Sequence, residues 1–466
     1  MKLVSPEFLC FFLLVLCLHW SLPRRWRVAW LVLASYFFYA WWDWRFTGLL
    51  FALTCASYFI GKTVGVSAQP GRRSAWVAAA VVLHVGGLSC FKFATLGADS
   101  VEVLRVHNIA GLLLPLGLSY YTFQSLGYVL DVSRGAAAAT GFLPYCLFVG
   151  FFPQITAGPI GRARHLLPQI EAPRDFDRSR FFEGCHLIYW GLFQKIFVAD
   201  NLSPIVVSVF DASAADSGFS ALIGIYAFTF QLYGDFAGYS NIARGLGKCL
   251  GLDLAENFRL PFFAQDMQEH WKRWHVSLSE WFADFVYRPL VDLPLDYYKF
   301  FAAPLATLLV MGLWHRFSAQ MAVLGLNYGF WIALTIYLKL AALRRDYAFS
   351  GTAAAVLPWV NRFVTIHLVC AGFILLRAHS LSQAVSLASS VFSAPRLTAQ
   401  GRDMFGRLLF FAGPLMVAEI VEHWRGGAGS LVRLPAAARG LLYACIAILL
   451  LGYGRFNSPS FFYSKF

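Results

Sequence analysis

The stretch Phe258–Trp331 decides how the rest of the chain is interpreted. It begins FRLPFFAQDMQEHWKRWHVSLSEWFADFVYRPL, continues through an apolar run that ends LLVMGLWHRF, and closes with SAQMAVLGLNYGFW. Its first half sets charged and imidazole side chains among aromatic neighbours, whereas its second half carries a single histidine, His315, at the end of the apolar run. An ionisable group at membrane depth is expensive unless it is paired or used. We therefore expect this stretch to hold the functional site.

The composition around this stretch is typical of a membrane protein. Of the 466 residues, 58% are hydrophobic and 14% are charged, against about 25% charged residues in a soluble domain. The net charge of +13 is expected to lie mostly in cytoplasmic loops, so it does not indicate a nucleic-acid partner. The sequence predicts an all-α polytopic membrane protein with about eleven transmembrane helices and short re-entrant helices.

The first apolar run, residues 6–22, is expected to be a retained transmembrane helix. It is followed, not preceded, by the basic cluster Arg24, Arg25 and Arg27, which is the reverse of a secretory leader. That cluster and the basic loop 62–73 both fit the cytoplasmic side, so the N-terminus is expected outside. Further spans are expected near residues 28–42, 46–61, 75–92, 109–131, 181–209 and 218–248.

Residues 141–161 are expected to form a broken or re-entrant segment. They read GFLPYCLFVGFFPQITAGPIG, a density of Pro and Gly that is tolerated at membrane depth only where protein or water satisfies the freed backbone. In the span at 218–248, Asp235 is expected either to pair with a basic group or to line the site.

Several common active-site motifs do not fit this chain. His270 and His275 are five residues apart, which places them roughly 140° apart on one helix, and Glu269 precedes both. We therefore expect no zinc site. The run GLGKCLG at 245–251 is not a GxGxxG loop, and no GxSxG or Walker A motif occurs. The nine cysteines form no CxxC pair and are expected to act as small hydrophobes.

His275 and His315 are the candidate catalytic residues. An unperturbed imidazole has a pKa of about 6.5, which suits a general base at neutral pH. Each histidine also has a plainer explanation: His275 as an interfacial residue of an amphipathic helix beside Lys272 and Arg273, and His315 as a core residue bonded to a backbone carbonyl. Because intramembrane ionisable groups are rarely retained without use, we favour a functional role for both.

Long motifs of this chain resemble the membrane-bound O-acyltransferases, in particular the branch of the bacterial alginate O-acetyltransferase membrane subunit. They are QLYGDFAGYSNIARGLGKCLGLDLAENFRLPF, EHWKRWHVSLSEWFADFVYRPL, GLWH, LPLGLSYYTFQSLGYVLDV and FFPQITAGPIGRARHLLPQI. The resemblance implies a ring of tilted helices around a central funnel. It also implies that His275 and His315 define the site. We expect one integral-membrane domain over 1–466, with N-terminal helices to about 135, a core at about 136–380 and C-terminal helices after it.

The resemblance further implies the reaction and its participants. We expect transfer of an acyl group, by resemblance acetyl, from cytoplasmic acyl-CoA or an acyl carrier thioester to a hydroxyl of an extracytoplasmic polysaccharide or partner protein. A separate extracytoplasmic acetyltransferase partner, the bacterial inner membrane and no permanent cofactor are expected. Substrate contacts are expected from Trp274, Arg273, Lys272, Trp314, Asp235, Tyr239, Ser240, Tyr328, Asn327 and Gln154. Arg162 and Arg164 are expected to contact the phosphates of the donor.

The chain departs from this branch just after GLWH. The branch usually reads GLWHG and then WGxxHG, whereas this chain reads GLWHR and then LGLNYG. Arg316 thus replaces a glycine, and Tyr328 stands where the later histidine would be. Since the pair His275 and His315 is intact, the same reaction class is expected.

Two other functions remain open from the residues. One is a proton-coupled secondary transporter with His315, Asp235 and Arg377 as a relay. The other is a non-catalytic subunit of a polymer-export complex. The lack of an internal inverted repeat disfavours the transporter, and the intact histidine pair disfavours the non-catalytic subunit.

Overall fold

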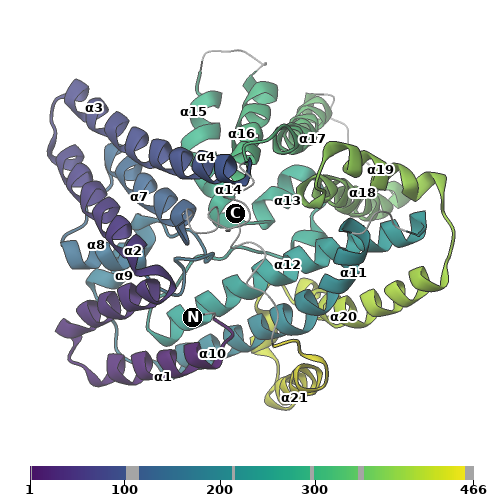
Figure 1. Ribbon diagram of the computed structural model, residues 1–466, viewed down its shortest axis with the longest axis horizontal. Helices are drawn as coiled ribbons and strands as arrows, with labels where there is room; N and C mark the ends of the chain where they lie inside the picture. The colour runs from purple at the N-terminus through teal and green to yellow at the C-terminus, as the bar shows by residue number, and fades with distance from the viewer. Residues whose placement is uncertain (2, 101–114, 212–215, 294–298, 345–350, 457–466) are drawn as a thin grey trace. The chain divides into compact units, whose positions relative to one another are not determined.

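The computed structural model describes residues 1, 3–100, 115–211, 216–293, 299–344 and 351–456 (Figure 1). Apart from one isolated antiparallel bridge between Phe258 and Trp274, the regular elements in these residues are all helical. Helices satisfy their own backbone hydrogen bonds, which is the requirement a bilayer places on a chain that crosses it.

Seven helices of the described residues are long and apolar enough to span a membrane. Large apolar side chains are exposed on several of them, including Trp44 at 75% and Leu451 at 84%. Such exposure in a polytopic chain indicates a surface that faces lipid. The protein is therefore an all-α polytopic membrane protein, as the composition predicts.

The chain divides into two compact units, which we describe separately. Unit 1 comprises Met1–Trp190 and Tyr239–Glu256, and unit 2 comprises Gly191–Gly238 and Asn257–Phe466. The chain passes from unit 1 to unit 2 at the end of α10, returns to unit 1 within the long helix α12, and enters unit 2 again after Glu256.

Unit 1 is built mainly on the long helix α2 (Arg24–Val66), which carries two predicted spans. The expected break between residues 42 and 46 is a kink at Asp43, whose backbone is non-helical with φ −159° and ψ 108°. The Asp43 carboxylate accepts hydrogen bonds from the backbone and side chain of Arg45 and so fixes the kink. The other helices of unit 1 are α1 (Pro6–Ser21), α3 (Pro70–Val81), η1 (Val82–Gly86), α4 (Gly87–Ser100), α7 (Leu118–Ser133), α8 (Phe142–Gly150), α9 (Ala163–Glu171), α10 (Arg178–Leu192) and the end of α12 (Gly218–Cys249).

The broken segment predicted at 141–161 is confirmed. Helix α8 ends at Gly150 and gives way to a buried turn before α9 begins. The Gln154 side chain satisfies one freed backbone group by donating from Nε2 to the Phe148 carbonyl at 3.1 Å. Gly158 is required there, because a Cβ atom on it would lie 2.4 Å from the Cα atom of Gln154. The predicted span at 109–131 lies partly outside the described residues and ends in α7.

Unit 2 contains the tight helical hairpin of α16 (Lys299–His315) and α17 (Ala319–Arg344), which lie side by side (Figure 1). Glycines make the close approach possible. A Cβ atom on Gly312 would lie 2.3 Å from the Met321 carbonyl oxygen, and one on Gly325 would lie 2.3 Å from that of Leu308. Because His315 is the last residue of α16, this packing fixes the position of its backbone.

The remaining helices of unit 2 come before and after this hairpin in the chain. They are η2 (Phe193–Ala199), α11 (Asp200–Phe210), the first part of α12, η3 (Pro261–Phe263), α13 (Met267–Arg273), α14 (Val276–Phe282), η4 (Ala283–Tyr287), α15 (Arg288–Val291), α18 (Gly351–Arg377), α19 (Leu381–Ser393), α20 (Ala399–Trp424), η6 (Ser430–Arg433) and α21 (Ala436–Tyr453). Three of them, α18, α20 and α21, are among the seven candidate spans.

Candidate active site

His275 lies at a break between two short helices and not on one continuous amphipathic helix. Helix α13 starts at Met267 and is capped by Asp266, whose side chain accepts a hydrogen bond from the Glu269 backbone at 2.7 Å. The Glu269 side chain in turn accepts from the Gln265 backbone at 2.7 Å, which completes a reciprocal cap. Helix α13 ends at Arg273, and α14 begins just after His275.

The backbone of His275 is left-handed, with φ 42° and ψ 53°. A residue with a Cβ atom rarely adopts this conformation, and its neighbours hold it there. The backbone N–H of Val276 donates to the Asn257 carbonyl at 2.9 Å, and the Leu278 and Ser279 N–H groups donate to the His275 carbonyl at 3.0 Å. A strained residue held in this way in a buried region is a reason to suspect a functional role.

A short bridge anchors the break from the other side. Phe258 pairs with Trp274 in an antiparallel bridge, and the Arg259 N–H donates to the Arg273 carbonyl at 3.0 Å. Asn257 also accepts a hydrogen bond through its side chain, since the Ser277 hydroxyl lies 2.6 Å from Oδ1. The residues Asn257, Phe258 and Arg259 therefore hold the backbone on both sides of His275.

The imidazole of His275 is buried, with 2% of its surface exposed. The Phe236 ring packs edge-on against it at a centroid distance of 4.5 Å. Burial first, and then the nearby imidazole of His315, hold the pKa of His275 well below its usual range. His275 is therefore neutral at pH 7, with one ring nitrogen able to donate a hydrogen bond and the other able to accept one.

His315 is the last residue of α16 and is half-buried beside the Trp314 ring, at a centroid distance of 4.5 Å. His315 has an electrostatic effect on the pKa of His275, so the two imidazoles lie within range of each other's charge. Residues that are 40 positions apart in the sequence (315 − 275) are thus brought together within unit 2.

Aromatic side chains form a wall behind this pair. The Trp274 ring stacks on His270 at 5.7 Å and packs against Phe258 at 5.0 Å and Phe373 at 5.1 Å. His270 is 3% exposed, its Nδ1 lies 3.2 Å from the Pro261 carbonyl, and burial lowers its pKa to about 4. In the sequence, His270 stands out only as a possible metal ligand, and nothing there indicates this packing role.

Tyr328 and Asn327 are both engaged in packing within α17 and its neighbours. The Tyr328 hydroxyl donates to the Val369 carbonyl at 2.9 Å, and its ring fills the space above Gly372, where a Cβ atom would lie 2.2 Å from it. Asn327 accepts a hydrogen bond from the Trp331 indole at 3.2 Å. Tyr328 therefore joins α17 to α18.

The two basic residues before His275 differ in their surroundings. Arg273 is held by Glu269, with Nη2 2.6 Å from Oε1, and by the Arg259 carbonyl. Lys272 is exposed. Lys272 is thus the more available of the two for an anionic substrate.

Asp235 takes part in a buried ion triad. The Lys195 ammonium lies 2.6 Å from the Asp235 carboxylate and 2.8 Å from that of Asp200, and all three side chains are at most 9% exposed. Of the two expectations for Asp235, pairing with a basic group is the one found. Arg377, the other charged member of the transporter relay, pairs with Asp211 at 2.7 Å.

The other predicted site residues belong to unit 1. Tyr239, Ser240 and Gln154 are each at most 2% exposed there, and Arg162 is 7% exposed, whereas Arg164 is exposed. Among the described residues of the chain, no group of three His, Cys, Asp or Glu side chains is placed to hold a metal ion.

Comparison with known proteins gives a consistent result. The model of the membrane-bound O-acyltransferase family matches residues 129–376. The probable alginate O-acetylase AlgI of Azotobacter vinelandii is 36% identical over 400 residues, covering 84% of this chain and 77% of that protein.

Two further relatives act on other polymers, by their names. The peptidoglycan O-acetyltransferase of Helicobacter pylori is 28% identical over 77% of this chain and 72% of that protein. The teichoic acid D-alanyltransferase of Bacillus subtilis is 27% identical over 57% of this chain and 69% of that protein.

Proposed function

The chain belongs to the membrane-bound O-acyltransferase family, and we propose that it uses His275 and His315 to move an acyl group from a cytoplasmic thioester to a hydroxyl on the far side of the membrane. As a membrane-bound O-acyltransferase related to enzymes that act on alginate, peptidoglycan and teichoic acid, it acts on a polysaccharide.

The proposal is supported by a buried, neutral His275 that feels the charge of His315, the last residue of an apolar helix. In the proposed step, His315 takes the proton of the attacking hydroxyl while its oxygen forms a bond to the thioester carbonyl carbon. The C–S bond then breaks, the thiolate leaves, and the proton held by His315 is available to neutralise it. A thiol has a pKa of about 8.5, so this leaving group departs readily.

His275 is proposed to orient the donor or to polarise its carbonyl. A neutral imidazole can donate an N–H to an oxyanion without presenting a competing charge. The rigid left-handed backbone at His275 supports this role, because a fixed donor needs no reorganisation as charge develops.

The donor is proposed to be acetyl-CoA or an acyl carrier thioester, and the exposed Arg164 and Lys272 suit its phosphates. Buried Arg162, and the residues Gln154, Tyr239, Ser240, Trp274, Trp314 and Asn327, remain proposed substrate contacts. We further propose a bacterial inner-membrane location with the N-terminus outside. A separate extracytoplasmic protein is proposed to complete the transfer to the polymer.

The test is release of coenzyme A from acetyl-CoA by the full chain in nanodiscs, comparing wild type with His315→Ala and His275→Ala. A general base contributes about 10²–10⁴-fold, so a loss of that size is expected in His315→Ala. His165→Ala is the matched control, since His165 is an exposed histidine of α9. Equal turnover in wild type and His315→Ala would remove His315 as the base, provided that thermal melting shows both to be folded.

A further inference from the structure

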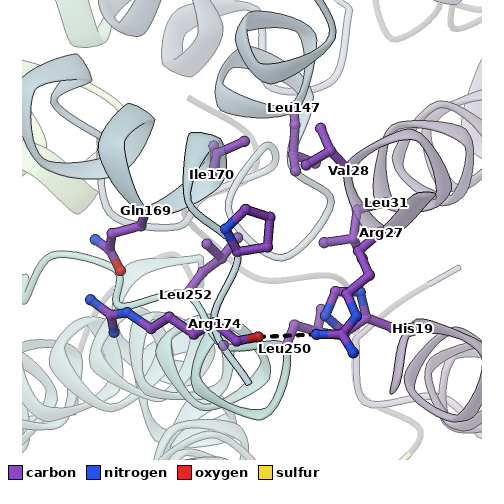
Figure 2. A pocket seen from close by; sticks show the side chains of 12 residues that line it. His19, Arg27, Val28, Leu31, Leu147, Gln169, Ile170, Arg174, Leu250 and Leu252 are labelled. Carbon is purple, nitrogen blue, oxygen red and sulfur yellow. Dashed lines mark hydrogen bonds between the residues drawn. The ribbon is translucent and has the colours of Figure 1, made fainter. Parts of the chain in front are cut away.

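Buried polar side chains outside the histidine pair are of two kinds. Some are satisfied by their surroundings, as in unit 1, where Arg27 donates to the carbonyls of Leu22 and Arg174 at 3.1 and 3.0 Å (Figure 2). The hollow beside Arg27, about 20 Å³, has room for about one water molecule. Glu419 of unit 2 is of the other kind. It is 1% exposed in the candidate membrane span α20, and its Oε2 atom has no hydrogen-bond partner in the part of the chain that the structure describes. An ionisable group at such a position is expensive unless it is used.

The other carboxyl oxygen of Glu419 holds Tyr233. The Tyr233 hydroxyl donates to Oε1 of Glu419, and this bond joins α12 to α20 across 186 positions of the chain. Tyr233 is 3% exposed, so both partners are removed from solvent. Because a buried hydroxyl that loses its partner is costly, the bond fixes where the Tyr233 ring lies.

The Tyr233 ring belongs to the aromatic wall behind His275. Its centroid lies 5.3 Å from that of Phe258, 5.0 Å from that of Phe262 and 6.0 Å from that of Trp274. Phe258 and Trp274 form the antiparallel bridge, and Trp274 directly precedes His275. Tyr233 therefore packs against both residues of the bridge that holds the backbone beside His275.

A second ring of α12 reaches the imidazole itself. Phe236 follows Tyr233 by three residues, a spacing that places both on one face of the helix. The Phe236 ring packs against Phe258 at 5.1 Å and edge-on against His275 at 4.5 Å. Since packed interiors transmit small shifts, a movement of α12 at Tyr233 would be passed to the imidazole through Phe236.

We propose that Glu419 is a positioning residue of the acyl-transfer site, which acts through Tyr233 to fix the orientation of the His275 imidazole. The proposal rests on the proposed function, because it takes His275 to act in the transfer. The carboxyl of Glu419 serves as a hydrogen-bond acceptor, so a side-chain amide can take its place through its carbonyl oxygen. Orientation matters because a misplacement of about 1 Å at a reacting group can cost about 10²-fold in rate.

The test measures acyl transfer by the full chain in nanodiscs, at a temperature well below the melting of every variant. Glu419→Leu and Tyr233→Phe each break the bond between the two side chains and are expected to lower kcat about 10- to 100-fold with KM unchanged. Glu419→Gln keeps an acceptor for the Tyr233 hydroxyl and is expected to restore most of the activity. Tyr226→Phe is the matched control, because it removes from α12 the hydroxyl that lies 2.6 Å from Nε2 of His367.

Nuclear magnetic resonance of isotope-labelled histidine gives a readout that does not depend on turnover. The edge-on Phe236 ring shifts the resonance of His275, which is assigned as the signal missing in His275→Ala. Glu419→Leu and Tyr233→Phe are expected to move this resonance in the same direction. Glu419→Gln and Tyr226→Phe are expected to leave it in place.

Three results would overturn the proposal. A His275 resonance that stays in place in Glu419→Leu would show that the carboxyl does not orient the imidazole. Equal losses of kcat in Glu419→Leu and Glu419→Gln would show that its role is not to accept from Tyr233. An equal loss in Tyr226→Phe would assign the effect to general loosening of α12.

Failure of the proposed function would be seen separately. Full activity in His275→Ala would remove His275 from the reaction, and the resonance alone would then decide whether Glu419 orients its imidazole.

Discussion

Because the backbone of His275 is left-handed, a glycine substitution can separate the chemical role of its side chain from its structural role. Relieving a left-handed conformation by glycine is worth about 1 kcal/mol, because glycine has no Cβ atom to clash. We expect His275→Gly to melt within a few degrees of wild type in detergent, while acyl transfer is lost. A variant that melts normally and keeps full activity would show that the imidazole has no part in the reaction.

The sequence could single out His275 and His315 but not the geometry around them. The left-handed conformation is held by the Val276–Asn257 hydrogen bond, which joins residues 19 positions apart (276 − 257) and so is not a local contact. Local preference gives no sign of it, since histidine rarely adopts this conformation. The packing of Tyr328 under Val369 was equally hidden, because it depends on how α17 meets α18.

At the scale of the elements, the α16–α17 hairpin sets the position of His315. A Cβ atom on Gly312 would collide with the Met321 carbonyl, so Gly312→Ala is expected to destabilise the protein by about 1–3 kcal/mol and to reduce acyl transfer. Gly406→Ala in α20 is the matched control, since nothing lies within 4 Å of the added atom. Thermal melting and coenzyme A release would be measured together, and equal melting of the two variants would contradict this account of the hairpin.

The buried ion triad joins the elements η2, α11 and α12. Lys195→Met would leave the carboxylates of Asp200 and Asp235 buried without their counter-charge, at a cost of about 3–5 kcal/mol. The triple variant Lys195→Met with Asp200→Asn and Asp235→Asn is expected to recover most of this loss. If Lys195→Met melts like wild type, the triad does not stabilise unit 2.

The elements themselves were predicted in part. The break between the spans expected at 28–42 and 46–61 is present, but as a kink at Asp43 within the single helix α2. The broken segment after α8 follows from the Pro and Gly of 141–161. The break between α13 and α14 could not be predicted from the sequence, because polar and apolar residues alternate too irregularly there to show where a helix ends. Helix α13 begins at the Asp266 cap, and its end is held by the bridge between Trp274 and Phe258, 16 positions apart (274 − 258).

For the whole molecule, two buried histidines predict sensitivity to acid. The pKa of His270 is about 4 in the folded protein and about 6.5 when unfolded, so the unfolded state binds more protons between these values. Stability is therefore full above about pH 6.5 and falls as the pH decreases toward 4, by about 2 kcal/mol at pH 5 for His270 alone. The lowered pKa of His275 acts in the same direction.

Melting of wild type and His270→Asn at pH 7.5 and pH 5 would check this. The variant is expected to lose less stability on acidification, whereas His165→Ala is expected to behave like wild type because that histidine is exposed. An equal acid response in all three proteins would mean that His270 does not stay neutral in the fold.

The class of the whole molecule was predictable because composition alone demands a bilayer, and long motifs carried the family. The division into two units was not, since each combines segments distant in the sequence, such as Met1–Trp190 with Tyr239–Glu256. About eleven spans were expected from apolar runs, whereas seven helices of the described residues meet the length and composition of a span. Part of the difference is α2, which joins two expected spans.

The most direct test of the central claim is a double-substitution cycle on acyl transfer by the full chain, with His275→Ala, His315→Ala and both together. If the two imidazoles act as one unit, each single substitution is expected to reduce the rate about as much as the double does. Rate losses that multiply would contradict the account, because they would mean that the two histidines act independently.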